Sequence, residues 1–274
     1  MRPSSIARTL VLLVATAALA GCDDPKASGM TATGGASTAA IPTAAVGATG
    51  AAPASAAVSA SATASATAAP KKEVVCKKDA VITFEDPTLE GVVRVQLQKK
   101  DGPILRAELK KVKTLNLSNA PSCDVLDPCL MPEFTGVRGL YLAPGKLSDL
   151  TPLKTLTQLE SLRVSATSVV DLSPLAGLVK LDRLDIGRTR VKDLTPLAGL
   201  VNLTELQIDE TEVTDLSPLA SLTKLELLQI KRTAVSDVSP LKGIRTLKHL
   251  YIEGSLVKDV SALSGIPGLK IHEG

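Results

Sequence analysis

Three side chains with acid–base character alternate along one short stretch near the C-terminal end of the chain. His249, Tyr251 and Glu253 are two residues apart, so on an extended strand they point to the same side and lie close together. A hydrolase or transferase would also need an activated Ser or Cys nucleophile or a set of metal ligands, and no such spacing surrounds them. We therefore predict a binding surface rather than an enzyme, with no metal and no cofactor.

A column of aspartates recurs every 22 residues, at Asp149, Asp171, Asp193, Asp215, Asp237 and Asp259. Carboxylates stacked about 5 Å apart on neighbouring turns could hold a ladder of cations such as Ca²⁺. We favour the interpretation that each carboxylate accepts backbone N–H bonds in the following turn. A large fall in the melting temperature on adding EDTA would contradict this interpretation.

Three cysteines are candidates for a disulfide: Cys76, Cys123 and Cys129. An exported chain enters an oxidising compartment, so we expect one disulfide and one remaining thiol. A Cys123–Cys129 bond, which would close an inserted loop, is the preferred pairing. A bond from Cys76 that staples the N-terminal segment to the first turn is the alternative. The cysteines include no C-x-x-C pair and have no nearby His, which argues against a metal site.

These residues are positioned by an internal repeat. Seven apolar residues share one register, each 22 residues after the last: Val137, Leu159, Leu181, Leu203, Leu225, Leu247 and Leu269. Each full unit reads L-x-x-L-x-[VIL]-x-x-T-x-V-x-D-[LV]-S/T-P-L. A single unit cannot bury its own leucines, whereas stacked units share an interior and pair their short strands. The repeat therefore predicts a solenoid.

Each unit contains its own strand, bend and short helical turn. The L-x-x-L-x-I run from Leu181 is too short for a helix and suits a strand. A Thr follows at positions 167, 189, 211 and 233, and we expect its hydroxyl to bond a backbone group at the bend. In the Ser-Pro and Thr-Pro pairs we interpret the Ser or Thr as the N-cap and the Pro as the first helical residue.

The unit resembles the bacterial leucine-rich repeats of the internalin type, which also carry D-[IL]-[ST]-P-L within 22 residues. The resemblance implies an α/β solenoid, a right-handed superhelix with short parallel strands on the concave face and short helices or 3-10 turns on the convex side. The family usually has Asn at the bend, where this chain has Thr. The resemblance also suggests protein ligands and, from F-x-D-P-x-L-E before the first strand, a helical N-terminal cap.

We assign residues 71–111 to this cap and residues 112–274 to the solenoid. Asp86 as N-cap and Pro87 as the first helical residue predict a helix that ends at Asp101-Gly102-Pro103, with residues 104–111 forming a second helical segment. The apolar side of the first helix is expected to comprise Leu89, Val92, Val93, Val95 and Leu97. The strand spacing fails at residues 269–272, so we expect the last turn to be frayed or covered by a partner.

The N-terminus predicts export and lipidation. Arg2 and Arg8 precede a short apolar segment, and Leu19-Ala20-Gly21-Cys22 resembles the lipobox of bacterial lipoproteins, in which the Cys is lipidated once residues 1–21 are removed. Residues 22–70 are mostly Ala, Ser, Thr, Gly and Pro, and we expect a disordered tether. This arrangement predicts an anchored cell-envelope protein at the outer membrane or cell surface, with the inner membrane as the alternative.

The outward residues of the predicted strands vary between units while the leucines do not, which is how repeat proteins build extended binding faces. The candidates for binding a protein or glycan on the concave face are Arg163, Arg183, Gln207, Gln229, Lys231, His249 and Tyr251. The net charge is only +3 and aromatic residues make up 1% of the chain, so we predict no nucleic-acid partner. A structural or assembly role in the envelope, without a dedicated ligand, is the alternative function.

Overall fold

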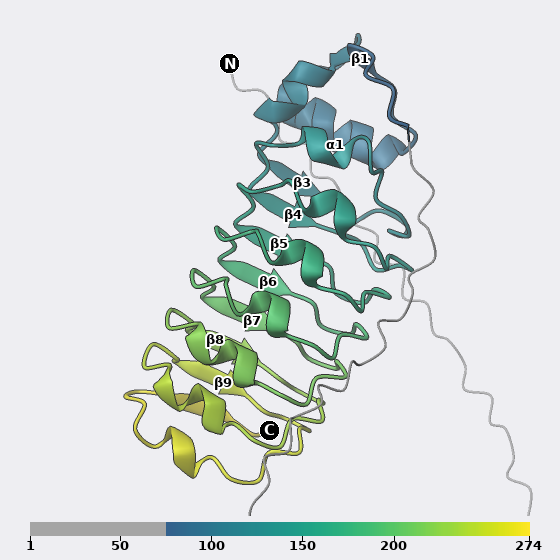
Figure 1. The fold of residues 1–274 in the computed structure, drawn as a ribbon. Coiled ribbons are helices and arrows are strands. Elements are labelled where there is room, and N and C mark those ends of the chain that lie inside the picture. The colour runs from purple at the N-terminus through teal and green to yellow at the C-terminus, as the bar shows by residue number, and fades with distance from the viewer. Residues whose placement is uncertain (1–74) are drawn as a thin grey trace, which may run out of the picture. The chain divides into compact units, whose positions relative to one another are not determined.

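One parallel sheet runs the length of the solenoid (Figure 1). The computed structural model describes residues 75–274, and the expected signal peptide, Cys22 and the tether lie outside this range. Eight strands pair in sequence order. They are β3 (Thr114–Asn116), β4 (Gly139–Tyr141), β5 (Ser161–Arg163), β6 (Arg183–Asp185), β7 (Glu205–Gln207), β8 (Leu227–Gln229), β9 (His249–Tyr251) and β10 (Lys270–His272).

A 3-10 turn lies across the coil between each pair of neighbouring strands from β3 to β10 (Figure 1). These turns are η2 (Met131–Glu133), η3 (Thr151–Leu153), η4 (Ser173–Leu175), η5 (Thr195–Leu197), η6 (Ser217–Ser221), η7 (Ser239–Gly243) and η8 (Ser261–Leu263). Strands on one side and tight turns on the other form the predicted leucine-rich repeat solenoid.

The leucines fill the space between the strands and the 3-10 turns. The middle residue of each strand from β3 to β9 is a leucine that points inward, and neighbouring strands align these residues, as in Leu184 opposite Leu206. The seven apolar positions of one unit are each at most 1% exposed: Leu181, Leu184, Ile186, Val191, Leu194, Leu197 and Leu200. The core is therefore continuous from turn to turn, and the outward strand residues remain at the surface.

The bend after each strand is held by a buried threonine, as expected. The hydroxyl of Thr189 donates to the carbonyl of Ile186 at 2.7 Å, and Thr167, Thr211 and Thr233 make the equivalent bond. The residue before each threonine has a left-handed backbone, with φ of 55° at Arg188. Its N–H donates to the next turn, where Asp209 O lies 2.7 Å away. Left-handed conformation costs a non-glycine residue about 1–2 kcal/mol, so the bond between turns is formed against local strain.

Helix α1 (Pro87–Leu97) packs against β3 at the N-terminal end of the sheet. Asp86 is its N-cap and accepts the N–H of Thr88 at 2.8 Å, with Pro87 following, as predicted. Leu89 and Val93 are buried, whereas Val95 is 76% exposed, so its assignment to the apolar side is wrong. The helix ends at Leu97, earlier than predicted, because Gln98 adopts the left-handed conformation at φ 54°.

The segment that follows α1 is only partly helical. Residues 106–111 form the 3-10 helix η1 (Arg106–Lys111), but β2 (Ile104–Leu105) pairs antiparallel with β1 (Val81–Ile82). The expected second helix is therefore shorter by two residues. Pairing with β1 satisfies backbone groups that a longer helix would have used internally.

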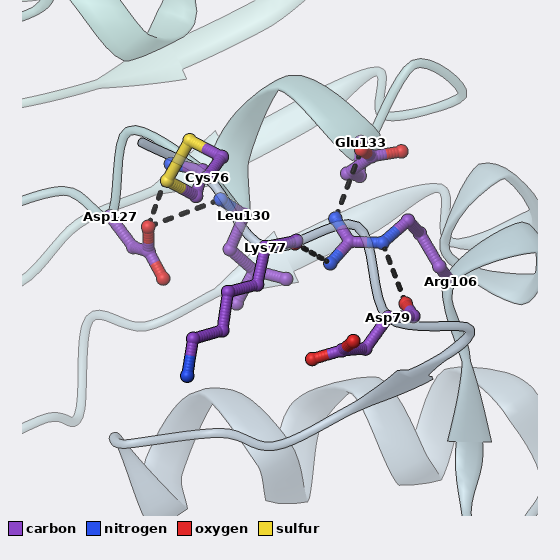
Figure 2. Close-up of polar contacts among 8 residues, drawn as sticks. Cys76, Lys77, Asp79, Arg106, Asp127, Leu130 and Glu133 are labelled. Atoms are coloured by element: carbon purple, nitrogen blue, oxygen red, sulfur yellow. Dashed lines mark hydrogen bonds and ion pairs between the residues drawn. A yellow bond between two sulfur atoms is a disulfide. The ribbon is translucent and has the colours of Figure 1, made fainter. Parts of the chain in front are cut away.

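The inserted turn between β3 and β4 is tied to the start of the described chain (Figure 2). Cys76 and Cys129 form a disulfide, with Cα atoms 5.3 Å apart, and Cys123 remains a thiol. The preferred Cys123–Cys129 pairing is therefore wrong, and the alternative bond from Cys76 is present. Asp127 accepts the N–H groups of Cys129 and Leu130 and orders the chain beside the disulfide.

Arg106 connects the same segments by hydrogen bonds. Its guanidinium donates to the carbonyls of Lys77 and Asp79 and contacts the Glu133 carboxylate at 3.0 Å (Figure 2). Leu126, Leu130, Met131 and Phe134 of the inserted turn are buried against the core. The longer inserted turn thus extends the core and helps to anchor residues 76–82.

The last turn is ordered rather than frayed. β10 pairs with β9 in parallel, with Lys270 opposite His249 and His272 opposite Tyr251. This turn is one residue shorter than a 22-residue unit, so Ile271, and not His272, aligns with the inward Leu250. Turn η8 also forms although Ala262 replaces the usual proline. The loss of the sequence pattern reflects a shortened turn and not the end of the sheet.

We predict opposite effects of glycine at two alanines of similar exposure. Ala166 has φ 55° and Ala198 has φ −57°. Ala166→Gly removes left-handed strain and is expected to raise the free energy of unfolding by about 0.5–1 kcal/mol, after the loss of backbone entropy. Ala198→Gly is expected to lower it by about 0.5–1 kcal/mol. Urea unfolding measures both, and destabilisation of equal size in the two variants would refute the strain at the bend.

We also predict that the disulfide stabilises the N-terminal part of the solenoid. The bond closes a loop of sequence separation 53, and the chain-entropy relation gives a loss of about 4 kcal/mol when it is absent. The double variant Cys76→Ser, Cys129→Ser should unfold like the reduced parent and should not respond to reductant. Cys123→Ser is the matched control and should keep the full response. Loss of that response in the control would mean that Cys123 takes part in the bond.

Candidate binding face

The outward side chains of β3 to β10, together with the residues just after each strand, form what we call the sheet face. All seven residues predicted for binding lie here, on strands β5 to β9 or directly after β8. The structure divides them into two groups along the face. Arg163, Arg183 and Gln207 lie toward the middle turns, and Lys231, His249 and Tyr251 lie at the C-terminal end beside Gln229.

A groove of about 600 Å³ follows the ends of the strands on this face. Side chains of both charges line it on successive turns: Arg163, Asp185, Arg188, Gln207, Asp209, Glu210, Lys231, Arg232 and Glu253, with Ser165, Gly187 and Gly254 between them. A second hollow, of about 220 Å³, lies over the strands and includes Tyr141, Arg183 and Glu205. The face therefore offers an extended polar surface rather than one enclosed pocket.

Ion pairs between neighbouring turns hold the charged side chains of the face in place. Arg163 Nε lies 2.9 Å from Asp185 Oδ2, and Lys231 Nζ lies 3.8 Å from Glu253 Oε2. Arg183 is less tightly held, with Nε 3.9 Å from Glu205 Oε1 on the next turn and 3.5 Å from Asp182 Oδ2 on its own turn. Exposed pairs of this kind contribute about 0–1 kcal/mol to stability. They orient the groups more than they stabilise the fold, so a ligand can exchange partners with them at small cost.

Asp209 lines the groove and is half-buried. Burial raises its pKa, against the lowering by the backbone N–H of Lys231, which donates to Oδ1 at 2.7 Å. The carboxylate thus links two turns directly. Sequence inspection missed Asp209, Arg188 and Arg232, because they follow the predicted strands. The one available indication was that Arg188 and Arg232 occupy the same position two units apart.

An aromatic cluster forms the C-terminal end of the face. The rings of Tyr251 and His272 stack with centroids 4.2 Å apart, and His249 lies 5.6 Å from His272. Lys231 Nζ is 5.1 Å from the centre of the Tyr251 ring, within the range of a cation–π contact. His272 was not among the predicted residues, since the shortened last turn hid its alignment with Tyr251.

The aspartate column serves the backbone. Each Asp accepts the N–H two residues on, as in Asp193 Oδ1 with Thr195 N at 2.8 Å, and the same bond is made by Asp149, Asp171, Asp215, Asp237 and Asp259. The expectation that the carboxylates accept backbone N–H bonds is confirmed, but each bond lies within the same 22-residue unit, at the start of its 3-10 turn, and not in the next unit. The Ser or Thr is the first residue of the 3-10 turn, Pro is the second, and a Leu holds the N-cap position in η4 and η5, so the N-cap assignment is wrong.

Within residues 75–274, no group of three or more His, Cys, Asp and Glu is arranged to hold a metal ion. No helix of this part of the chain is long and apolar enough to cross a membrane.

The fold and the sheet face define a leucine-rich repeat solenoid. No protein-family model matches the sequence, and a search of curated proteins finds no match. Among solved structures, the chain is similar to internalin C2 of Listeria monocytogenes, with 28% sequence identity and a TM-score of 0.61 over 70% of this chain and 94% of that one. A second internalin of the same organism, inlF, has 25% identity and a TM-score of 0.61 over 69% of this chain and 56% of the other.

We predict that the aspartate column makes stability depend on acid pH. Hydrogen bonds from Thr195 lower the pKa of Asp193, and bonds from Ser217 and Ser261 lower the pKa of Asp215 and Asp259. A lowered folded-state pKa gives stability that is complete above the unfolded value, about 3.9, and is lost as pH falls through the folded value.

The variant Asp193→Asn keeps an acceptor oxygen but removes the charge. It is expected to be less stable than the parent at neutral pH, with the gap closing below about pH 4. Asp193→Ala is the matched control, because it removes the acceptor as well and should retain a deficit in acid. Urea unfolding at several pH values measures this, and an Asn deficit of constant size at all pH values would contradict the charge effect.

Proposed function

We propose that this chain is a non-enzymatic, lipid-anchored protein of the bacterial cell envelope that binds another protein through the sheet face. The variability of the outward residues over an invariant leucine core carries the proposal. Strands β5 to β9 place Ser161-Arg163, Arg183-Asp185, Glu205-Gln207, Leu227-Gln229 and His249-Tyr251 at equivalent positions. The scaffold needs none of these pairs in particular, so their identities are free to suit a ligand.

The dimensions of the face allow a protein ligand only if residues beyond the strands also contact it. Eight strands spaced about 4.8 Å apart give a strip about 34 Å long and, with three residues per strand, about 10 Å wide. This strip of roughly 340 Å² is less than half of the ~800 Å² that a partner buries in a standard interface. The residues after the strands, which line the 600 Å³ groove, must therefore contribute.

The charges of the face favour a partner of mixed charge. Arg163, Lys231 and Arg232 are interspersed with Asp185, Asp209 and Glu253 along the groove, so a partner with one sign of charge would meet repulsion on several turns. A glycan is the second ligand class consistent with these polar groups. The charged groups favour a protein ligand over a glycan, because a protein can supply side chains of opposite charge for salt bridges.

The alternative function is a structural or assembly role in which the convex side contacts other envelope proteins. Val179 and Val201 favour it, since they are 51% and 46% exposed at equivalent positions on successive turns. Two exposed valines are a small apolar surface, so the sheet face remains the better-supported site.

We predict that lipidation depends on Cys22. Metabolic labelling with a fatty-acid analogue in a bacterial host should label the full chain and not Cys22→Ser, and only the labelled protein should fractionate with membranes. Cys123→Ser is the control and should label normally. Equal labelling of the Cys22→Ser variant would refute the anchor.

We predict that the sheet face captures a partner in intact cells. A photo-crosslinking amino acid at Gln207 or Gln229 should trap the same protein, identified by mass spectrometry, whereas one at Lys242 in the 3-10 turn η7 should not. The double variant Lys231→Glu, Tyr251→Ala should reduce capture about tenfold or more, as expected for loss of a hot spot. Lys242→Glu is the matched charge reversal and should have no effect.

Capture only from Lys242, unchanged by the double variant, would contradict binding through the sheet face and support the assembly role.

A further inference from the structure

The only two histidines in the 274-residue chain meet on the sheet face. His249 lies on β9 and His272 on β10, and His249 Nδ1 is 3.3 Å from His272 Nε2. Both side chains are half-buried. They are 23 residues apart in the sequence, so only the pairing of the last two strands brings these nitrogens together.

The ring of His272 is held in place by its neighbour. It stacks on Tyr251 with an interplanar angle of 10° and a centroid distance of 4.2 Å. The facing nitrogens therefore belong to side chains whose orientation is restricted before any ligand arrives, which reduces the entropy lost on binding.

We propose that His249 and His272 bind a Zn²⁺ ion through these two nitrogens. Zinc–imidazole bonds are 2.0–2.1 Å long, and two such bonds at the tetrahedral angle place their nitrogens about 3.3–3.4 Å apart. The observed 3.3 Å agrees with this spacing. Ligands at a right angle, as in square-planar Cu²⁺ sites, would be closer, at about 2.8–3.0 Å.

Proton balance permits this ligation. In the metal-free protein one imidazole N–H can donate to the other ring across the 3.3 Å contact. Zinc needs a lone pair on both facing nitrogens, so the bridging proton moves to the remote nitrogen of the same ring. Both rings stay neutral and no proton need leave the protein.

The surroundings tolerate a cation and leave the site open. Lys231 is the positive group over the Tyr251 ring, and its Nζ lies 3.8 Å from the Glu253 carboxylate, which offsets its charge. Since no set of three His, Cys, Asp and Glu in residues 75–274 can close around a metal, the other coordination positions fall to water or to a carboxylate or imidazole of a bound molecule. The zinc site goes beyond the proposed function and does not depend on it.

The number of histidines makes a direct test simple. The imidazole region of the NMR spectrum holds signals from two rings only. The full chain carries Cys123→Ser in this test, to remove a competing thiol. Titration with ZnCl₂ at neutral pH should shift the imidazole signals of both rings together, and the shift should saturate at one equivalent of Zn²⁺. A shift of only one set, or of neither, would overturn the proposal.

Variants provide a second readout. His249→Gln and His272→Gln should each weaken Zn²⁺ binding at least about tenfold in isothermal titration calorimetry, because one ligand remains. Lys270 is an exposed residue on the same strand as His272, and the control variant Lys270→Gln should bind Zn²⁺ as the parent does. Unchanged affinity in both histidine variants would show that the two rings form a hydrogen bond only. Partner capture plays no part in either readout, so failure here leaves the proposed function untouched.

Discussion

Pairing of each turn with the next, in register, is the constraint on which the solenoid depends. The strands are only three residues long, and none could persist alone. Each turn donates backbone N–H groups to the carbonyls of the next, as from Ile186 to Gln207 and from Ile208 to Gln229. The same alignment places leucine against leucine in the core. Turn length therefore has to stay near 22 residues, and each departure needs a local solution: extra core residues and a disulfide in the inserted turn, and a shifted strand in the last.

This constraint separates the residues that build the coil from those that are free to vary. The positions of the leucines, the buried threonines and the aspartates before the 3-10 turns are all fixed by the repeat. The outward strand residues contact only solvent and one another, through weak ion pairs such as that between Arg163 and Asp185. The side chains of such a face can change without changing the fold, which is why the fold alone does not identify a ligand.

The sequence predicted those features that a fixed spacing determines. The core positions of the Leu181 unit and the bonds of Thr189 and Asp193 follow from residue type and period. Three features were not predicted, because the repeat spacing does not determine them. The left-handed residue is an Ala, Arg or Glu at the four bends that contain a threonine, and only the next bend has a Gly, Gly254, that would have marked it. Cys129 pairs with a cysteine far away in the sequence, since folding places residues 76–82 beside the inserted turn. His272 joins the aromatic cluster because the last turn lost one residue, which no repeat pattern foretells.

Amide hydrogen exchange, resolved by residue with NMR, tests the stacked-turn account most directly. The N–H groups of Ile186, Ile208 and Ile230 each bond the following turn and belong to fully buried residues. If in-register pairing of turns holds the solenoid together, these three amides should exchange far more slowly than the exposed amides of the 3-10 turns and should open together. Rapid exchange at all three, with slow exchange confined to the 3-10 turns, would contradict the account.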